Sequence, residues 1–193
     1  MPRFRSLRVQ VDTSFDGSLG STAIDGLLSL PPEPDPNVIY SFHFYQPPEL
    51  TALGAYRAGL EARAMAALPF PVSDTRACGA DTTIDPGTAA LIRFYCAQHW
   101  DVARIRSMIG QAGEWRRRYH VRVFAGEFCA SQRLNGPARL AWLTAVRGAC
   151  EQEGLGWALW GYDDSMGFGI SPPAVAPRID PAMIRALGLN RNE

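Results

Sequence analysis

Apolar and polar positions along the chain follow two different periods. Residues 7–11 alternate between apolar and polar side chains, and residues 38–45 are β-branched or aromatic and end before a pair of prolines. Both stretches predict β-strands. From Asp101 to Tyr119 apolar residues recur at helical spacing, which predicts an amphipathic helix. The apolar run over residues 121–125 follows at once and predicts a buried strand.

The rest of the chain continues this alternation of strands and helices. We predict helices over residues 22–30, 51–67, 136–154 and 180–187, a strand over residues 155–162 and a long irregular loop over residues 69–87. Strands alternating with helices are typical of an α/β fold with a parallel sheet. The pattern holds about four βα units, whereas a closed (β/α)8 barrel takes about 250 residues. The predicted fold class is therefore a partial (β/α)8 TIM barrel, whose open sheet edges need a cover.

Composition favours one ordinary globular domain over residues 1–193. Of the 193 residues, 47% are hydrophobic and 20% are charged, which is enough for one sizeable core. The 19 basic residues balance 19 acidic ones, so no long-range field attracts nucleic acid or an anionic membrane. No apolar run approaches the roughly 20 residues of a membrane span, and no secretory signal is visible at the N-terminus.

The cysteines Cys78, Cys96, Cys129 and Cys150 show no C-x-x-C spacing, which argues against a zinc site. Cys78 and Cys96 flank a long loop and can form a disulfide if the protein is exported. The alternative is four reduced thiols, and the missing secretory signal slightly favours it.

Polar and aromatic side chains gather where the predicted strands end, which is where α/β folds of this type carry their active residues. They are His43 and Tyr45 after one strand, Glu127 after the next, and Trp160, Tyr162 and Asp163 after the last. A carboxylate can attack an anomeric carbon, and an imidazole and a phenol can orient that carboxylate. An indole can stack on the apolar face of a pyranose ring. Together these groups predict a sugar-binding site.

Each of these residues also has a purely structural interpretation. A glutamate after a strand is most often a solvated turn residue, and a histidine within an apolar strand is commonly a satisfied core residue. Tyr45 and Trp160 are more often packing residues than ligand platforms. Asp163 and Asp164 are typical turn formers. What favours a functional role is the shared placement of these side chains at successive strand ends.

Three segments resemble, in order and spacing, the motifs of family 5 glycoside hydrolases. Residues 37–47 resemble the motif of the sixth barrel strand, residues 123–128 that of the seventh and residues 156–162 that of the eighth. Residues 139–142 also follow the family pattern. The resemblance extends over residues 24–170, which is most of the chain.

The resemblance implies the second half of a cellulase-like barrel, strands five to eight, and a role for each matching residue. The implied roles are nucleophile for Glu127, active-site residue for His43 and Tyr45, and substrate binding for Trp160, Tyr162 and Asp163. The family's general acid/base is the glutamate of an Asn-Glu pair, and no such pair precedes His43. Cys129 also stands where the family motif often has a glycine.

The expected function is therefore that of a retaining, endoglucanase-like glycoside hydrolase for β-linked polysaccharide, truncated and weakly active or inactive alone. One alternative is a non-catalytic carbohydrate-binding remnant. Another is a half-barrel that forms a homodimer or binds a complementing chain over its open sheet edges. The expected partner is a β-glucan or a related oligosaccharide, and no metal, organic cofactor, nucleic acid or membrane is implied. The chain shows no signal peptide, yet the family is commonly secreted, so we make no prediction for the location of the protein.

Overall fold

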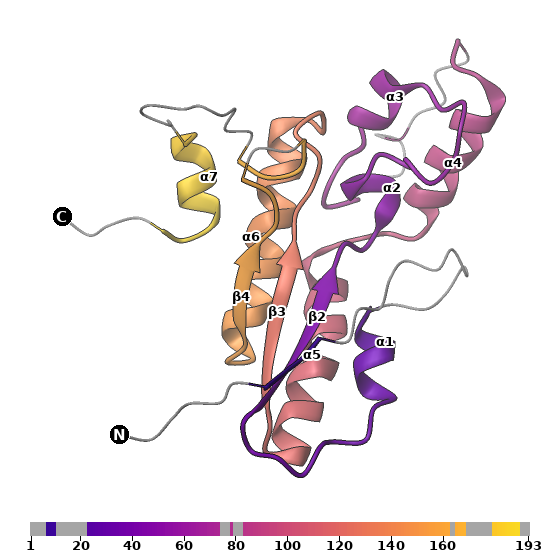
Figure 1. Ribbon diagram of the computed structural model, residues 1–193. Coiled ribbons are helices and arrows are strands. Elements are labelled where there is room, and N and C mark those ends of the chain that lie inside the picture. The colour runs from indigo at the N-terminus through magenta and orange to yellow at the C-terminus, as the bar shows by residue number, and fades with distance from the viewer. Residues whose placement is uncertain are drawn as a thin grey trace.

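The computed structural model describes residues 7–10, 23–73, 78, 83–162, 165–168 and 179–189, and its chain path is shown in Figure 1. In chain order the elements are β1 (Leu7–Gln10), α1 (Ala23–Leu28), β2 (Val38–Phe44), α2 (Pro48–Thr51), α3 (Ala62–Ala66), α4 (Pro86–Ala97), α5 (Val102–Tyr119), β3 (Arg122–Phe128), α6 (Gly136–Gln152), β4 (Gly156–Leu159) and α7 (Pro181–Ala186). No helix in the described part of the chain is long and apolar enough to cross a membrane.

The strands form one parallel sheet in which spatial order follows chain order, β1-β2-β3-β4. Each step from one strand to the next passes through at least one helix, as parallel pairing requires. The predicted α/β fold with parallel strands is confirmed. Strand β3 runs beyond its predicted end, so that Glu127 lies within the strand, and β4 is shorter than predicted.

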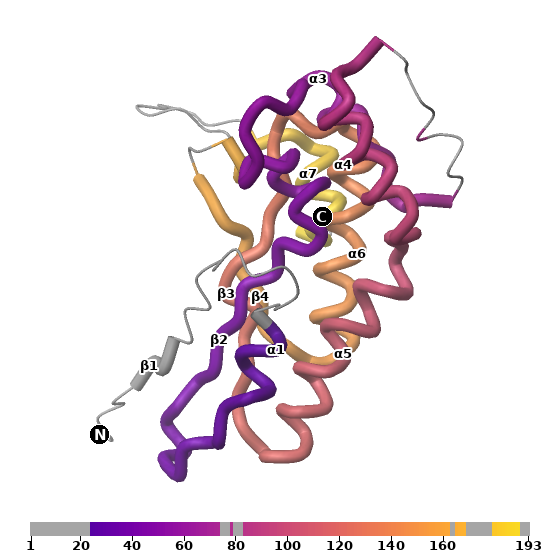
Figure 2. Tube along the Cα trace, turned by 90° about the vertical axis from the view of Figure 1, so that its right-hand side faces the viewer, coloured from indigo at the N-terminus to yellow at the C-terminus, as the bar shows by residue number. Residues whose placement is uncertain are grey.

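Helices α1, α5 and α6 cover one face of the sheet, as the side view in Figure 2 shows. Burial alternates along β2, as expected for a strand with one covered face. Tyr40 and Phe42 are buried beneath the helices, whereas Ser41 and His43 on the other face are only half-buried. Trp142 of α6 is fully buried in this core. The helix-covered side therefore supplies the packing, and the other face carries polar groups.

Residues 51–67 do not form the single helix that was predicted. Helices α2 and α3 are short and are separated by turns. Within these turns Leu53, Gly54 and Gly59 have φ values of 52°, 67° and 80°, and this left-handed conformation cannot continue a right-handed helix. The prediction was wrong because the Ala- and Leu-rich composition was given more weight than the two glycines, which favour such turns.

Helix α4 was not predicted: it begins at the end of the loop predicted over residues 69–87 and continues through residues to which no element was assigned. The Asp85 carboxylate caps its start by accepting hydrogen bonds from the backbone N–H groups of Gly87 (2.8 Å) and Thr88 (3.0 Å). Pro86 fills the first turn, where no backbone donor is needed. An Asp-Pro pair is a helix-start signal, and Asp180 opens α7 in the same way. The sequence thus held a signal for the start of α4 that the prediction did not use.

A disulfide joins Cys78 to Cys96 of α4, so the slight preference for four reduced thiols was wrong. The two Cα atoms lie 6.3 Å apart, within the range that a disulfide spans. Spacing along the chain could not decide this pairing, because α4 sets where Cys96 lies. Cys129 and Cys150 are buried and take no part in the disulfide. Burial raises the pKa of Cys150 to about 12, which keeps this thiol protonated.

Candidate active site

Two neighbouring strands place His43 and Glu127 side by side at the carboxyl end of the sheet. His43 of β2 pairs in register with Glu127 of β3, and the register shifts between Phe42 and His43, so that Gly126 is an extra residue in β3. Such a bulge changes which face the following side chains occupy. Without it Glu127 would share the face of Ala125, which is buried beneath the helices. The bulge therefore turns the carboxylate toward His43.

The glycine at this bulge leaves room for a side chain of β2. A Cβ atom added to Gly126 would lie 2.3 Å from the Ser41 hydroxyl oxygen, which is far inside van der Waals contact. Any other residue at this position would therefore require the Ser41 side chain to turn away.

Glu127 is held by two side chains from β2 and the residue after it. The Tyr45 hydroxyl donates a hydrogen bond to Glu127 Oε2 at 3.1 Å, and His43 Nδ1 lies 3.2 Å from the same oxygen. The side chains of His43 and Glu127 are 15% and 20% exposed. Neither structural interpretation fits these values, because Glu127 is not a solvated turn residue and His43 is not enclosed in the core. The structure thus brings three of the predicted site residues together.

Tyr45 is fixed in place through its backbone and that of its neighbour. The buried Thr51 hydroxyl donates a hydrogen bond to the Tyr45 carbonyl at 2.6 Å. The Trp142 indole N–H donates to the Gln46 carbonyl at 2.9 Å. These contacts tie the loop after β2 to α2 and to the core helix α6. No such role was predicted for Thr51 or Trp142, since one hydrogen bond lies within a turn and the other joins segments that are distant along the chain.

Trp160 and Tyr162 follow β4 and are unusually exposed for aromatic residues, at 44% and 56%. The Trp160 backbone N–H donates to the Phe128 carbonyl at 3.1 Å, which places Trp160 beside the strand end that carries Glu127. In the described part of the chain, no hydrogen bond or ring contact joins either aromatic side chain to the three residues around Glu127. Trp160 is therefore not enclosed in the core, and its role as a substrate platform stays a prediction. Asp163 lies outside the described residues.

Arg139 of α6 joins two segments near this site, a role that was not predicted from the sequence. It is 9% exposed and donates hydrogen bonds to the backbone carbonyls of Ala130 (2.9 Å), Met166 (3.0 Å) and Gly167 (2.8 Å). One guanidinium thus joins the segment after β3 to the loop after β4. A signal was available, because Arg139 lies one helical turn from Leu143 on the apolar face of α6. A charged residue on a buried face requires partners.

The loop after β4 folds back tightly on itself. The Phe168 backbone N–H donates to the Gly161 carbonyl at 3.0 Å, and the Gln132 N–H donates to the Ser165 carbonyl at 2.8 Å. A Cβ atom on Gly167 would lie 1.5 Å from the Gly161 oxygen, so only glycine fits there. Together with Arg139, these bonds hold the loop that carries the exposed aromatic residues against the end of β3.

A second glutamate near the carboxyl ends of the strands has different surroundings. Glu49 of α2 is 6% exposed, and its Oε1 accepts a hydrogen bond from the Tyr56 hydroxyl at 2.6 Å. Burial, and then the hydrogen bond and charge of Glu49, raise the pKa of Tyr56. Among the described residues no three His, Cys, Asp or Glu side chains gather in a way that could hold a metal ion.

Comparisons with known proteins relate the sequence and the fold of this chain to endoglucanases. No protein-family model matches the chain. Endoglucanase 3 of Fibrobacter succinogenes is 26% identical to it over 137 residues, which are 68% of this chain and 20% of that protein. The solved endoglucanase Cel5A of Thermotoga maritima matches with a TM-score of 0.60 and 18% identity, over 86% of this chain and 44% of that one. This Thermotoga protein has also been solved with cellobiose and with mannotriose.

A hyperthermophilic endo-β-1,4-glucanase, solved with substrate, matches with a TM-score of 0.57 and 22% identity, over 86% of this chain and 44% of that one. The chain thus spans a fifth of the length of its curated relative and less than half of these structures. The structural likeness shows that the α/β fold resembles that of glycoside hydrolases. Both the sequence relative and the structural neighbours are cellulase-like.

Proposed function

We propose that the chain carries the nucleophile of a retaining β-glycan hydrolase, and that Glu127 is this nucleophile. The supporting observation is the orientation of its carboxylate, since Oε2 accepts a hydrogen bond from Tyr45 and lies 3.2 Å from His43 Nδ1. A carboxylate held through one oxygen can present the other to an anomeric carbon in a defined direction. The exposed Trp160 would supply the platform on which the sugar ring stacks, with Tyr162 and Asp163 as further substrate contacts.

In the proposed mechanism Glu127 attacks the anomeric carbon, the bond to the departing oxygen breaks, and a covalent glycosyl-enzyme forms. Water later hydrolyses this intermediate. A second carboxyl group about 5–5.5 Å from the nucleophile must protonate the departing oxygen and then activate the water. Glu49 does not fit this role, because its side chain is buried and accepts a hydrogen bond from the Tyr56 hydroxyl. We therefore expect little turnover of natural glycans by this chain alone.

The proposal includes a partial barrel whose strands correspond to the fifth to eighth strands of a complete one. Strands β1 and β4 form the two edges of the sheet, and the structures that resemble the chain are more than twice as long as the part it matches. Further βα units, from a homodimer partner or a complementing chain, would cover these edges and supply the second carboxyl group. Light scattering tests the homodimer, and a monomer at micromolar concentration would exclude it.

The substrate we propose is a β-linked glucan or a related oligosaccharide. This choice rests on the endoglucanases that the chain resembles, two of which have been solved with substrate or with cellobiose. The Thermotoga neighbour was also solved with mannotriose, so a mannan is the second substrate to test.

The decisive experiment uses 2,4-dinitrophenyl 2-deoxy-2-fluoro-β-cellobioside. Its leaving group departs without protonation, so the glycosylation step needs the nucleophile but not the acid, and the fluorine slows hydrolysis of the adduct. We expect mass spectrometry to find one glycosyl adduct on the peptide that contains Glu127, and none in Glu127→Gln. An adduct on another residue, or none on the wild type, would overturn the proposal.

A reducing-sugar assay with soluble β-glucan tests the missing acid/base separately. We expect at most weak turnover. Robust turnover that is abolished by Glu127→Gln would show that the chain holds an acid/base group that we have not located.

A non-catalytic carbohydrate-binding role is the second candidate, and the exposure of Trp160 and Tyr162 favours it. Such a protein would be stabilised against heat by cello-oligosaccharides, and Trp160→Ala would remove this stabilisation. Binding without any covalent adduct on Glu127 would support this role over catalysis.

A further inference from the structure

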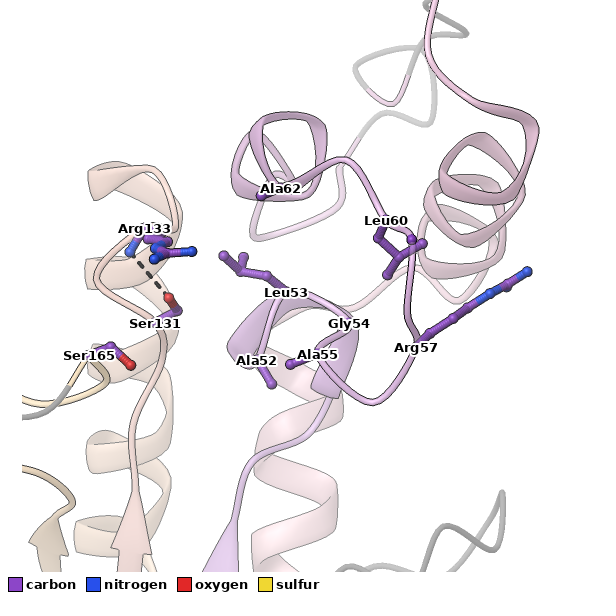
Figure 3. A pocket seen from close by; sticks show the side chains of 11 residues that line it. Ala52, Leu53, Gly54, Ala55, Arg57, Leu60, Ala62, Ser131, Arg133 and Ser165 are labelled. Carbon is purple, nitrogen blue, oxygen red and sulfur yellow. Dashed lines mark hydrogen bonds between the residues drawn. The ribbon is translucent and has the colours of Figure 1, made fainter.

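A hollow lies near the candidate active site, at the carboxyl end of the sheet. Its volume is about 380 Å³, within the roughly 300–1,000 Å³ of small-molecule sites. The turns after α2 form one wall and the segment after β3 forms the other, as Figure 3 shows. None of the residues to which we gave a role in the proposed reaction lines it.

The two walls differ in chemistry. The wall after α2 is built mainly from small or apolar side chains, among them Ala52, Leu53 and Ala55. The facing wall carries Ser131, Arg133 and, from the loop after β4, Ser165. In Figure 3 the side chains of Arg133 and Leu53 point toward one another across the hollow. One side therefore offers charge and hydroxyl groups, and the other offers contact for C–H groups.

Arg133 is the cation that faces this hollow. Its backbone N–H donates to the Ser131 hydroxyl at 3.2 Å, but its guanidinium has no ion pair or hydrogen bond with any described residue. No Asp or Glu is among the residues that line the hollow. Arg57 also lies at the rim, yet Figure 3 shows its side chain directed away from the hollow. Its charge instead acts on Asp85, whose pKa is lowered mainly by hydrogen bonds from Thr88 and further by Arg57.

Hydrogen bonds connect the hollow to the candidate active site. The Ser131 N–H donates to the Thr51 carbonyl at 2.8 Å, and the Thr51 hydroxyl holds the carbonyl of Tyr45. On the other side, the Gln132 backbone N–H donates a hydrogen bond to the Ser165 carbonyl in the loop after β4. The residues that line the hollow are thus tied by hydrogen bonds to the segments that carry Tyr45 and Trp160 at the carboxyl end of the sheet.

We propose that this hollow binds a sugar residue that carries a carboxylate, and that Arg133 is the group that recognises the carboxylate. A guanidinium matches a carboxylate with two parallel hydrogen bonds. The hydroxyl groups beside it suit ring hydroxyls, and the apolar wall suits the C–H face of a pyranose. The inference rests on the proposed glycan-binding function and narrows its substrate to β-glycans with acidic substituents.

The test compares cellotetraose with the same oligosaccharide oxidised to carboxylates at its C6 positions, by isothermal titration calorimetry on the full chain. The two probes share one backbone and differ in charge. We expect the oxidised probe to bind about three- to tenfold more tightly at low salt, and this preference to shrink as salt is added. Arg133→Gln should abolish the preference and leave the affinity for cellotetraose unchanged.

Arg57→Gln is the matched control, since both arginines are exposed and line the same hollow. It should retain the preference for the oxidised probe, and free glucuronate should compete only weakly. Equal binding of both probes by the wild type would overturn the inference but leave the proposed function intact. A preference that survives Arg133→Gln would also overturn it. A third outcome would contradict the proposed function but not this inference. In it, the wild type does not bind cellotetraose but binds the oxidised probe, and Arg133→Gln abolishes that binding.

Discussion

Two glutamates near the carboxyl end of the sheet, Glu127 and Glu49, each accept a hydrogen bond from a tyrosine, yet only one is suited to chemistry on a ligand. The Glu127 side chain is 20% exposed and also lies against His43. Glu49 is 6% exposed, and its tyrosine partner Tyr56 is more accessible than the carboxylate itself. A reactive carboxylate must be oriented and also reachable, and Glu49 meets only the first requirement.

The difference arises from the backbone around each glutamate. Glu127 lies on a strand whose bulge turns it to the face that the helices leave open. Glu49 lies in the short helix α2, which packs toward α3 and α4. The same side chain is therefore a candidate nucleophile at one position and a structural acceptor at the other.

The largest expected effect separates the two glutamates directly. Glu127→Gln should lower the rate of labelling by the fluorinated cellobioside by about 10³-fold or more, because an amide is not a nucleophile. Glu49→Gln should leave this rate within about threefold of the wild type. Mass spectrometry over time measures both rates. Equal losses in the two variants would mean that the comparison is wrong.

Arg139 offers a second way to separate the two glutamates, because it holds the segments after β3 and β4, near Glu127, and, among the residues that the structure describes, makes no hydrogen bond to the segment that carries Glu49. Arg139→Met should lower the free energy of unfolding by about 2–4 kcal/mol, since it removes three hydrogen bonds from a buried guanidinium to backbone carbonyls. Urea unfolding measures this change. The exposed Arg106 on α5 is the control, and Arg106→Met should change stability by no more than about 0.5 kcal/mol.

Labelling of Arg139→Met below its unfolding transition then tests positioning as distinct from stability. If Arg139 positions the site, the folded variant should react more slowly and its Trp160 fluorescence should be quenched more easily by acrylamide. A folded variant with wild-type labelling and quenching would limit Arg139 to a structural role.

The two tyrosines allow a smaller test. Tyr45→Phe removes the hydrogen bond to Glu127 Oε2 and should slow labelling about tenfold, because a bond to a charged group is worth about 1.5 kcal/mol or more. Tyr56→Phe removes the corresponding bond to Glu49 and should not slow it. A slower reaction in Tyr56→Phe would show that the two sites are coupled.

The smallest expected effect is on how the free energy of unfolding changes with pH in the alkaline range. Burial, followed by Glu49, raises the pKa of Tyr56 in the folded protein above its ordinary value near 10. Folding therefore favours the neutral phenol, and its contribution to stability is complete below about pH 10 and is lost as the pH rises further. Denaturant unfolding between about pH 9 and pH 11 should show a shallower decline in Tyr56→Phe and in Glu49→Gln than in the wild type. An unchanged decline in both variants would contradict this role of Glu49.

Sequence patterns predicted the elements whose signals are local and repeated. Helix α5 has a regular apolar stripe, and β2 is an aromatic and β-branched run that ends at a proline pair. The region between β2 and α5 was predicted poorly. Its helices α2, α3 and α4 are short or start at a single Asp-Pro signal, and the left-handed turn at Leu53 has no local signature.

The sequence predicted which residues form the candidate site, but not the contacts that hold the surrounding segments in place. His43, Tyr45 and Glu127 were expected at strand ends, and the structure places them in contact. The disulfide between Cys78 and Cys96 was named as an alternative but was not preferred, and the role of Arg139 was not predicted. These contacts depend on where distant segments meet, which spacing along the chain does not specify.

The sequence by itself determined the parallel α/β arrangement and the placement of polar residues after the strands, because side-chain periodicity and turn residues act over short distances. Only the tertiary structure decided that a bulge at Gly126 turns Glu127 toward His43. It also decided that Arg139 joins the loop after β4 to the end of β3, and that Glu49 is buried. These outcomes depend on strand register and helix packing, which are set by contacts between residues far apart in the chain.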